Sequence, residues 1–223
     1  MSLAGNSNLI KTNWESPPAD PMVLMQDWVQ QAQAVSIAEP LGMTLTTVNS
    51  AGWAWNRVVL VKDFKQASII FGSSSSSDKG KDLEHNAKVA GSFWWRESVQ
   101  QIHFRGYAAI ASPSQSDLLF EKRSRSAKAI AICSQQSQPL KSESNFKTEV
   151  QALEQSDKEL SRPLNWNAYE IIPIEYEFWQ GDASRLHQRL RYTLQIPNVV
   201  LPASNLAESI IKSAIWTQQR LQP

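Results

Sequence analysis

The stretch MTLTTVNSAGWAWNRVVLV, residues 43–61, decides the fold. Its first six residues alternate and are rich in threonine, residues 49–52 (NSAG) favour a turn, and residues 53–61 are rich in aromatic and β-branched side chains. This order is typical of a β-hairpin, in which a short turn joins two antiparallel strands. Working outward, similar patterns predict further strands over residues 67–71, 88–95, 99–111, 169–179 and 185–194.

Helical patterns fall between these strands. Asp20 can cap a helix that begins with Pro21 and runs to about residue 36, and Ser77 can cap another helix after the serine run 73–77. Further helices are predicted from Ser112, over residues 127–134 and over about 145–160. Strands joined mostly as hairpins, with helices inserted between them, predict an α+β fold with a closed antiparallel sheet.

The length of 223 residues suits one domain. Prolines at 17, 18 and 21 predict a flexible N-terminal arm over residues 1–20, and residues 21–223 are expected to form the single domain. Residues 193–215 have no assigned role, and could cover the mouth of a pocket or extend a contact between subunits. The ending WTQQRLQP carries no predicted element.

Charge and glycine content exclude several partners. The chain has 22 Lys and Arg against 21 Asp and Glu, so no overall field draws it to nucleic acid or to an anionic membrane. None of its eight glycines stand at G-x-G spacing, which excludes the dinucleotide fingerprint and the P-loop. Any anion is therefore expected to bind through local side chains.

Cysteine and histidine are too sparse for a metal site. Cys133 stands alone and cannot form an internal disulfide, and the three histidines are far apart, so no metal is predicted. The N-terminus lacks the apolar core of a signal peptide, and no apolar run approaches the about 18 residues that span a bilayer. We expect a soluble protein of the cytoplasm.

Two segments place cations where burial would be costly. In N-R-V-V-L-V-K, residues 56–62, alternation puts Arg57 on one face of a strand and Lys62 on the other. If these two side chains are buried, each needs an anionic partner. The alternative is that both lie at strand ends and extend their charged groups into water. After the serine run, hydroxyls, a helix N-terminus and Lys79 could together hold a phosphate, although such a run alone is usually a flexible loop.

Two further cationic segments stand later in the chain. In S-R-L-H-Q-R-L-R-Y, residues 184–192, period two puts Arg185, His187, Arg189 and Arg191 on one strand face. They repel one another unless a negative or π-rich group lies across them, and the alternative is a solvated edge. Arg123 belongs to a cluster that could simply be favourable charge at a helix C-terminus.

In combination these segments resemble a known family. Five motifs carry the resemblance: E-F-W-Q-G-x-x-x-R-L-H-x-R at 177–189, R-V-V-L-V-K at 57–62, Lys79-Gly80, P-A-D-P at 18–21 and a final R-L-x-P. Together they resemble the pyridoxamine 5′-phosphate oxidase family of flavin-dependent split barrels. The resemblance covers residues 18–223. W-R-E-S-V-Q-Q-I at 95–102 and the ending Q-R-L-Q-P are similar to its phenazine-biosynthesis branch, the PhzG-type FMN oxidases.

The resemblance implies a bound FMN. Its cofactor-binding residues would be Arg57, Val58, Val59, Leu60, Val61, Lys62, Gly72, Ser73, Lys79, Gln101, Gln136, Ser137, Trp179 and Arg189. The substrate-binding residues would be Lys62, Arg123, Arg185 and His187, of which Arg185 and His187 are the catalytic candidates and His187 is the one candidate general base. The family also implies a homodimer whose two FMN sites each draw residues from both chains.

Departures from the family pattern concern phosphate binding. Asp78-Lys79 stands where the vitamin-B6 oxidases usually have R-K. Where those enzymes bind the substrate's phosphate with Tyr, Arg and Ser, this chain has Leu119, Arg123 and Ala127. A phosphate would lose about 1.5–3 kcal/mol for each missing charge-assisted bond. The pattern therefore favours a larger, flatter substrate that carries carboxylates.

The resulting hypothesis is an FMN-dependent oxidase of phenazine, and hence antibiotic, biosynthesis. It would oxidise a reduced (hexahydro- or tetrahydro-) phenazine carboxylic acid and pass the electrons to dioxygen. One alternative is a pyridoxamine/pyridoxine 5′-phosphate oxidase with an altered phosphate site. Another is a non-catalytic split barrel that binds flavin or haem.

Overall fold

The computed structural model describes residues 5–195 and 215–223. Within them the strands are β1 (Gly42–Val48), β2 (Ala54–Phe64), β3 (Ile69–Ser74), β4 (Lys88–Trp95), β5 (Gln100–Ile110), β6 (Trp166–Gln180), β7 (Gln188–Gln195) and β8 (Ile215–Arg220). The helices are α1 (Pro21–Ala34), α2 (Asp78–His85), α3 (Pro113–Glu121), α4 (Arg125–Cys133) and α5 (Glu143–Gln155).

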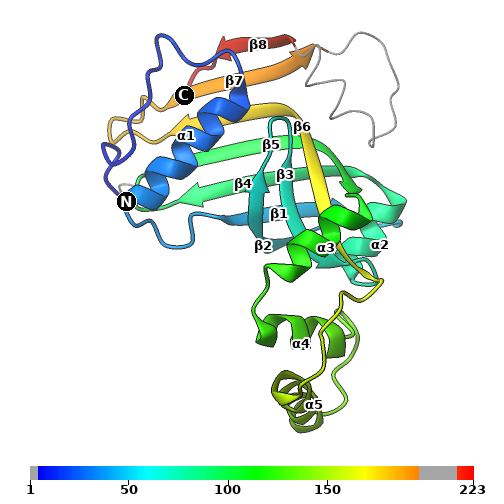
Figure 1. The fold of residues 1–223 in the computed structure, drawn as a ribbon. Coiled ribbons are helices and arrows are strands. Elements are labelled where there is room, and N and C mark those ends of the chain that lie inside the picture. Colours follow the sequence, from blue (N-terminus) through cyan, green and yellow to red (C-terminus); the bar gives the residue numbers. More distant parts are fainter. Residues whose placement is uncertain (1–4, 196–214) are drawn as a thin grey trace.

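The strands form an antiparallel barrel with an extension (Figure 1). Their order is β3-β2-β1-β4-β5-β6-β7-β8, and β3 also pairs with β6, which closes the first six strands on themselves. The hairpin of β1 and β2 is confirmed: Val48 pairs with Ala54 across a turn in which Gly52 has a φ of 83°. The structure thus confirms the α+β split-barrel prediction.

Helix α1 covers part of the barrel and contributes to its core. Asp20 accepts a hydrogen bond from the backbone N–H of Met22, and Pro21 begins the helix, as predicted. Trp28 is fully buried, with its ring 5.2 Å from Phe178 of β6. The apolar face of α1 and the inward-facing residues of the strands therefore share one core.

Residues 5–20 run along the barrel with defined contacts. Asn6 donates its N–H to the carbonyl of Glu97, Ile10 is buried, and the hydroxyl of Tyr192 donates to the carbonyl of Pro18. In the structure, the described part of the segment predicted as a flexible arm lies against β7 and the turn between β4 and β5.

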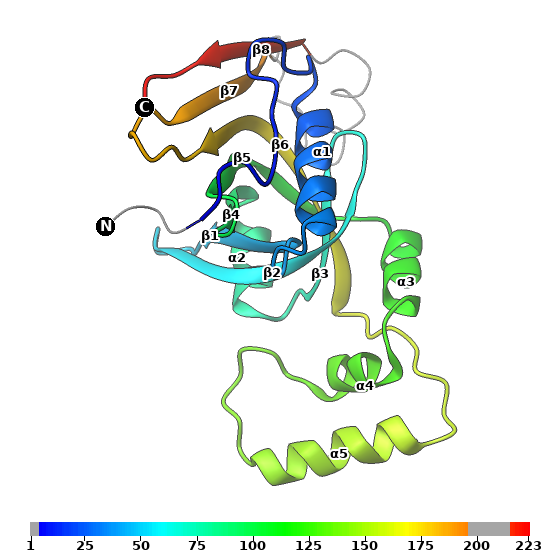
Figure 2. The same cartoon turned by 90° about the vertical axis from the view of Figure 1, so that its left-hand side faces the viewer.

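Helices α4 and α5 pack on each other away from the barrel (Figures 1 and 2). Their contact buries Ala129 of α4, Val150 of α5 and Leu160. Arg125 donates from Nε to the carbonyl of Glu154 at 2.6 Å and from Nη2 to that of Lys158 at 2.9 Å, which satisfies one carbonyl in the last turn of α5 and one beyond its end.

The predicted strand over 185–194 is wrong at its start. Strand β7 begins at Gln188, because the chain first makes a turn in which Arg185 has a φ of 70°. Arg185 and His187 therefore do not share a strand face with Arg189 and Arg191. The C-terminal tail, for which no element is predicted, forms β8 by pairing with β7. Residues 196–214, most of the unassigned segment, lie outside the described residues.

The helices of the described ranges include none with both the length and the apolar character needed to cross a membrane.

Candidate functional site

A cavity of about 600 Å³ lies between β2, β3, the N-terminus of α2, and α4. From β2 it takes the predicted residues Arg57, Val58, Val59, Leu60 and Lys62. The other predicted residues in its wall are Gly72, Ser73, Lys79, Arg123, Gln136 and Ser137. Val61 instead points into the barrel core and is 1% exposed.

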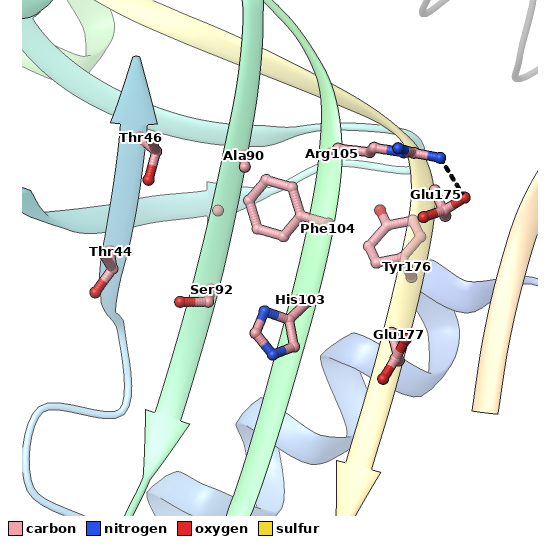
Figure 3. Close-up of a pocket in the computed structure, with 11 residues that line it drawn as sticks. Thr44, Thr46, Ala90, Ser92, His103, Phe104, Arg105, Glu175, Tyr176 and Glu177 are labelled. Atoms are coloured by element: carbon pink, nitrogen blue, oxygen red, sulfur yellow. Dashed lines mark hydrogen bonds and ion pairs between the residues drawn. The ribbon is translucent and has the colours of Figure 1, made fainter. Parts of the chain in front are cut away.

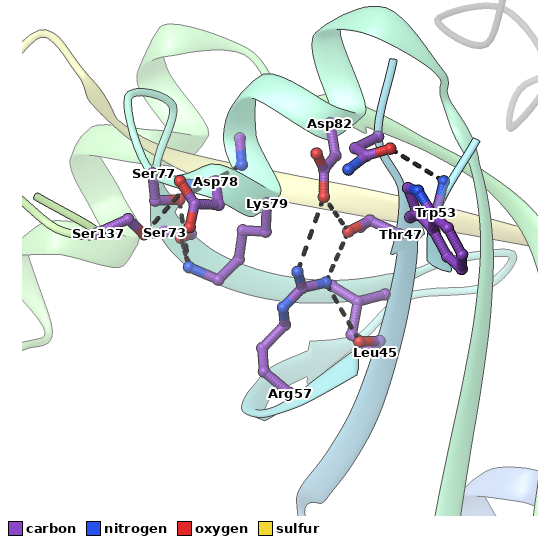
Figure 4. Close-up of polar contacts among 12 residues, drawn as sticks. Leu45, Thr47, Trp53, Arg57, Ser73, Ser77, Asp78, Lys79, Asp82 and Ser137 are labelled. Atoms are coloured by element: carbon purple, nitrogen blue, oxygen red, sulfur yellow. Dashed lines mark hydrogen bonds and ion pairs between the residues drawn. The ribbon is translucent and has the colours of Figure 1, made fainter. Parts of the chain in front are cut away.

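Lys79 anchors the polar end of this cavity. Its buried Nζ donates to the hydroxyl of Ser73 at 3.0 Å and to that of Ser77 at 3.2 Å. Ser77 caps α2 as predicted, and Ser137 accepts from the backbone N–H of Asp78 at 3.1 Å (Figure 4). Burial, and then the nearby Arg57, lowers the pKa of Lys79 to about 8, against the opposing effect of Asp78. This end of the cavity holds hydroxyls, a helix N-terminus and an ammonium that lacks a hydrogen-bonded carboxylate in the described structure.

Arg57 reaches the same end of the cavity from β2. It donates from Nη1 to the hydroxyl of Thr47 at 2.7 Å, and its Nη2 lies 3.7 Å from Oδ2 of Asp82. Burial lowers the pKa of Arg57, although the charges of Asp82 and Asp78 partly offset it. Two cations thus face this end of the cavity, which is suited to a phosphate dianion.

Arg123 is the cation at the α4 side of the cavity. Its guanidinium lies 5.1 Å from the ring centre of Trp166, and Nη2 donates to the carbonyl of Ala127 at 3.0 Å. Its buried Nε has no hydrogen-bond partner among the described residues, and burial lowers its pKa. A buried guanidinium N–H without an acceptor indicates a place for an anionic ligand.

The remaining predicted residues form a second group. Gln101 pairs with Trp179, which pairs with Arg189, so these three lie in one row across β5, β6 and β7. Trp166 of the cavity and Trp179 of the row stand on the same strand, on the order of 40 Å apart along it. Within one chain, none of the three residues of the row lines the cavity.

Glu177 binds Arg189 of this second group and also Arg191, two residues further along β7. Its Oε1 accepts from Nε and Nη2 of Arg189 at 2.9 and 2.6 Å, and its Oε2 accepts from Nη2 of Arg191 at 2.9 Å. Burial alone would raise the pKa of Glu177, but the hydrogen bonds and charges of the two arginines outweigh it and lower the pKa. A negative group thus lies across the arginines, as the sequence requires.

Beside Glu177 a smaller hollow of about 300 Å³ opens on the outer face of β1, β4, β5 and β6 (Figure 3). Its wall includes Ser92, His103 and Arg105, and Arg105 forms an ion pair with Glu175 at 2.9 Å. Burial lowers the pKa of His103, against the opposing charge of Glu177. The polar side chains of this hollow include Thr44, Ser92, His103 and Glu177.

Arg185 and His187 lie in the turn before β7. Nδ1 of His187 accepts the backbone N–H of Asp182 at 3.0 Å, and its ring lies 4.9 Å from that of Trp179. In a neutral imidazole with Nδ1 as acceptor, the proton is on Nε2. His187 can therefore offer a hydrogen-bond donor beside Trp179, whereas the nitrogen that could accept a proton is already engaged.

The cavity includes residues that the sequence analysis does not predict. Trp55, Ile130, Ser134 and Trp166 also line it. The places of Ile130, Ser134 and Trp166 depend on how α4 and the start of β6 fold over β3, for which the local sequence gives no signal. Trp55 lies on β2 two residues before Arg57, so the strand period of two could have predicted it. Among the predicted residues, Arg57, Lys62 and Lys79 stand out as cations near apolar or hydroxyl-rich segments, whereas others, such as Gln136, follow only from the family resemblance.

The donors present fit a flavin mononucleotide. Arg57, Lys79, Ser73 and Ser137 could hold its phosphate, and the apolar side chains of β2 could face its ring. The buried amine of Lys79 gives the site a positive charge that an anionic group would stabilise. A volume of about 600 Å³ lies within the range of small-molecule sites.

Comparison with known proteins covers almost the whole chain. A family model described as pyridoxamine 5′-phosphate oxidase matches residues 29–157. A model described as the pyridoxine 5′-phosphate oxidase C-terminal dimerisation region matches residues 166–223.

Individual relatives come from two groups. A pyridoxine/pyridoxamine 5′-phosphate oxidase of Bacteroides thetaiotaomicron is 37% identical over 180 residues, which cover 80% of this chain and 84% of the relative. A dihydrophenazinedicarboxylate synthase of Pseudomonas chlororaphis is 31% identical over 222 residues, which cover 100% of this chain and 92% of the relative.

A solved structure is also similar along its full length. The crystal structure of PhzG from Burkholderia lata 383, in complex with tetrahydrophenazine-1-carboxylic acid, has a TM-score of 0.87 and 29% identity and covers 98% of this chain and 100% of its own. With the barrel, the cavity and these matches together, the chain belongs to the pyridoxamine 5′-phosphate oxidase family.

Proposed function

We propose that this protein is an FMN-dependent oxidase that converts a reduced phenazine carboxylic acid to a more oxidised one, with dioxygen as the electron acceptor. The two-electron oxidation removes a hydride equivalent and a proton from the substrate, and dioxygen is reduced to hydrogen peroxide.

The observation that carries this proposal is the environment of Arg123. Arg123 lines the cavity with its guanidinium over the ring of Trp166, and its buried Nε–H has no partner among the described residues. Leu119 packs against the apolar cluster of Ile70, Ala111 and Ala168, and Ala127 contributes only its backbone carbonyl to Arg123. A planar guanidinium with few neighbouring donors suits a carboxylate better than a phosphate dianion.

The relatives support both branches of the family. The synthase and the PhzG structure align along the whole length of this chain, whereas the match to the Bacteroides oxidase covers 80% of it at higher identity. Pyridoxamine/pyridoxine 5′-phosphate oxidation is therefore the second candidate, and it is favoured by the retained Arg123 and by that identity.

Each residue group has its own task in this scheme. When bound, FMN supplies the redox chemistry. Arg57 and Lys79 hold its phosphate, and Lys62 and Arg123 orient the substrate's carboxylate. His187 donates a hydrogen bond from Nε2, and Trp179 shields the reacting region from water.

A homodimer completes the site in this proposal. The row of Gln101, Trp179 and Arg189 does not line the cavity of its own chain. A two-fold related copy would bring its row to that cavity and give two equal sites. The match of residues 166–223 to a dimerisation region supports this arrangement.

Spectroscopy of the purified protein tests the proposal. We expect a yellow protein whose flavin absorbance is lost when a reduced phenazine carboxylic acid is added without oxygen and returns in air. Protein that takes up no flavin would refute both oxidase functions. A flavoprotein that only pyridoxamine 5′-phosphate bleaches would establish the second candidate.

A further inference from the structure

Thr47 joins Arg57 to a buried carboxylate at the polar end of the cavity. Arg57 donates from Nη1 to Oγ1 of Thr47 at 2.7 Å and to the carbonyl of Leu45 at 3.4 Å. Oγ1 of Thr47 in turn donates to Oδ2 of Asp82 at 2.6 Å. Figure 4 shows this chain of contacts running from β2 through β1 to α2.

The direction of these bonds is definite, because a guanidinium only donates and a carboxylate only accepts. Thr47 is 0% exposed and Asp82 is 9% exposed. A threonine hydroxyl has one proton and two lone pairs, so a proton given to Asp82 leaves a lone pair for Arg57. Asp82 thus orients the hydroxyl that Arg57 uses, and the guanidinium is planar, so fixing one edge sets the direction of the others.

Considered by its charge alone, a carboxylate at position 82 should oppose the binding of an anion. Asp82 adds a negative charge beside Arg57, where a phosphate is to bind. By Coulomb's law its removal should strengthen the binding of an anion. A role in positioning predicts the reverse sign, which makes the two explanations separable.

We propose that Asp82, acting through Thr47 and through its own ion pair with Arg57, is a positioning residue that holds Arg57 in the orientation that binds the phosphate of FMN. The inference rests on the proposed function, since it concerns the same cofactor site. It assigns to an acidic residue of α2 a favourable effect on the binding of an anion.

The test measures dissociation constants of FMN and riboflavin for the apoprotein by quenching of flavin fluorescence. We expect Asp82→Ala and Thr47→Val each to weaken FMN binding by about tenfold or more, because both break the same chain of bonds. Riboflavin lacks the phosphate, so its dissociation constant should change less than threefold. The double variant should resemble either single variant, since the two residues act as one unit.

Two controls separate positioning from charge and from folding. Thr47→Ser keeps the hydroxyl and should bind FMN within threefold of the wild type. Glu84→Ala removes an exposed carboxylate from the same helix and should leave binding unchanged. If Asp82→Ala does not fold, the comparison of Thr47→Val with Thr47→Ser decides the matter.

Tighter or unchanged FMN binding in Asp82→Ala or Thr47→Val would overturn the inference, as would an equal loss of riboflavin binding. A wild-type protein that binds neither flavin would instead refute the proposed function.

Discussion

At the scale of single residues, Lys79 shows how the cavity is prepared for an anion. Its ammonium is buried among hydroxyls, and its pKa of about 8 means that burial already disfavours its charge. A bound phosphate would stabilise the charged form and raise this pKa. As the pH rises above about 8, Lys79 of the empty site progressively loses its proton, and binding must then recover one from solution.

This gives a pH dependence with a definite sign. The dissociation constant of FMN should change little between about pH 7 and 7.5, where the phosphate is a dianion, and rise between about pH 8 and 9.5, because binding becomes coupled to proton uptake. Fluorescence titrations across this range measure it. Lys79→Met should bind FMN about 10- to 100-fold more weakly and lose this rise. A wild-type constant that stays flat to pH 9.5 would contradict the assignment.

The histidine of the turn gives a second prediction at this scale. Nδ1 of His187 is occupied by the N–H of Asp182, so we assign it a donor role rather than that of a base. His187→Asn should slow anaerobic flavin reduction less than tenfold. A loss of more than about 100-fold, which is typical of a missing general base, would show that His187 takes the proton.

At the scale of elements, the start of β6 is coupled to β3 through a close approach. A Cβ added to Gly72 would lie 2.5 Å from Cζ2 of Trp166, so only glycine leaves room for this ring. Trp166 also carries Arg123 on its face. The contact thus links the floor of the cavity to the orientation of its unpaired guanidinium.

Gly72→Ala should therefore affect both stability and substrate binding. We expect it to destabilise the protein by about 1–3 kcal/mol, as overpacking commonly does, and to weaken the binding of a phenazine carboxylate. Thermal melts and substrate titrations measure the two effects. A Gly72→Ala/Trp166→Leu double variant should recover stability but not substrate affinity. An unchanged melting temperature for Gly72→Ala would show that the ring can move freely.

How far the sequence predicts an element depends on how local its causes are. The β1–β2 hairpin and the caps Asp20 and Ser77 follow from alternation and from bonds within a few residues, and both predictions are confirmed. The start of β7 is set by the bond between Asp182 and His187, which overrides the period-two pattern. Strand β8 exists through pairing with β7, a contact between distant residues.

At the scale of the whole molecule, the predicted site divides into two groups. The cations and hydroxyls of β2, β3 and α2 line one cavity, whereas Gln101, Trp179 and Arg189 form a row elsewhere on the sheet. The sequence identifies the members of both groups by residue type and motif. It cannot show that one chain keeps them apart, because that depends on the path of β6.

Complementation tests whether two chains share each site. Lys79→Met and Trp179→Ala should each be nearly inactive alone. Unfolded together in equal amounts and refolded, they should regain about a quarter of wild-type activity, because half of the dimers are mixed and each has one intact site. Two copies of the same variant refolded in parallel serve as the control. No gain in the mixture would show that each site is built from one chain.

The most direct test of the central claim is the rate at which substrate reduces the enzyme-bound flavin in the absence of oxygen. Stopped-flow absorbance should show at least 100-fold faster reduction, per unit of substrate concentration, by a tetrahydrophenazine carboxylic acid than by pyridoxamine 5′-phosphate. Arg123→Met should remove most of this preference, because Arg123 is the guanidinium assigned to the carboxylate. Equal or faster reduction by pyridoxamine 5′-phosphate would contradict the account and make the protein a vitamin-B6 oxidase.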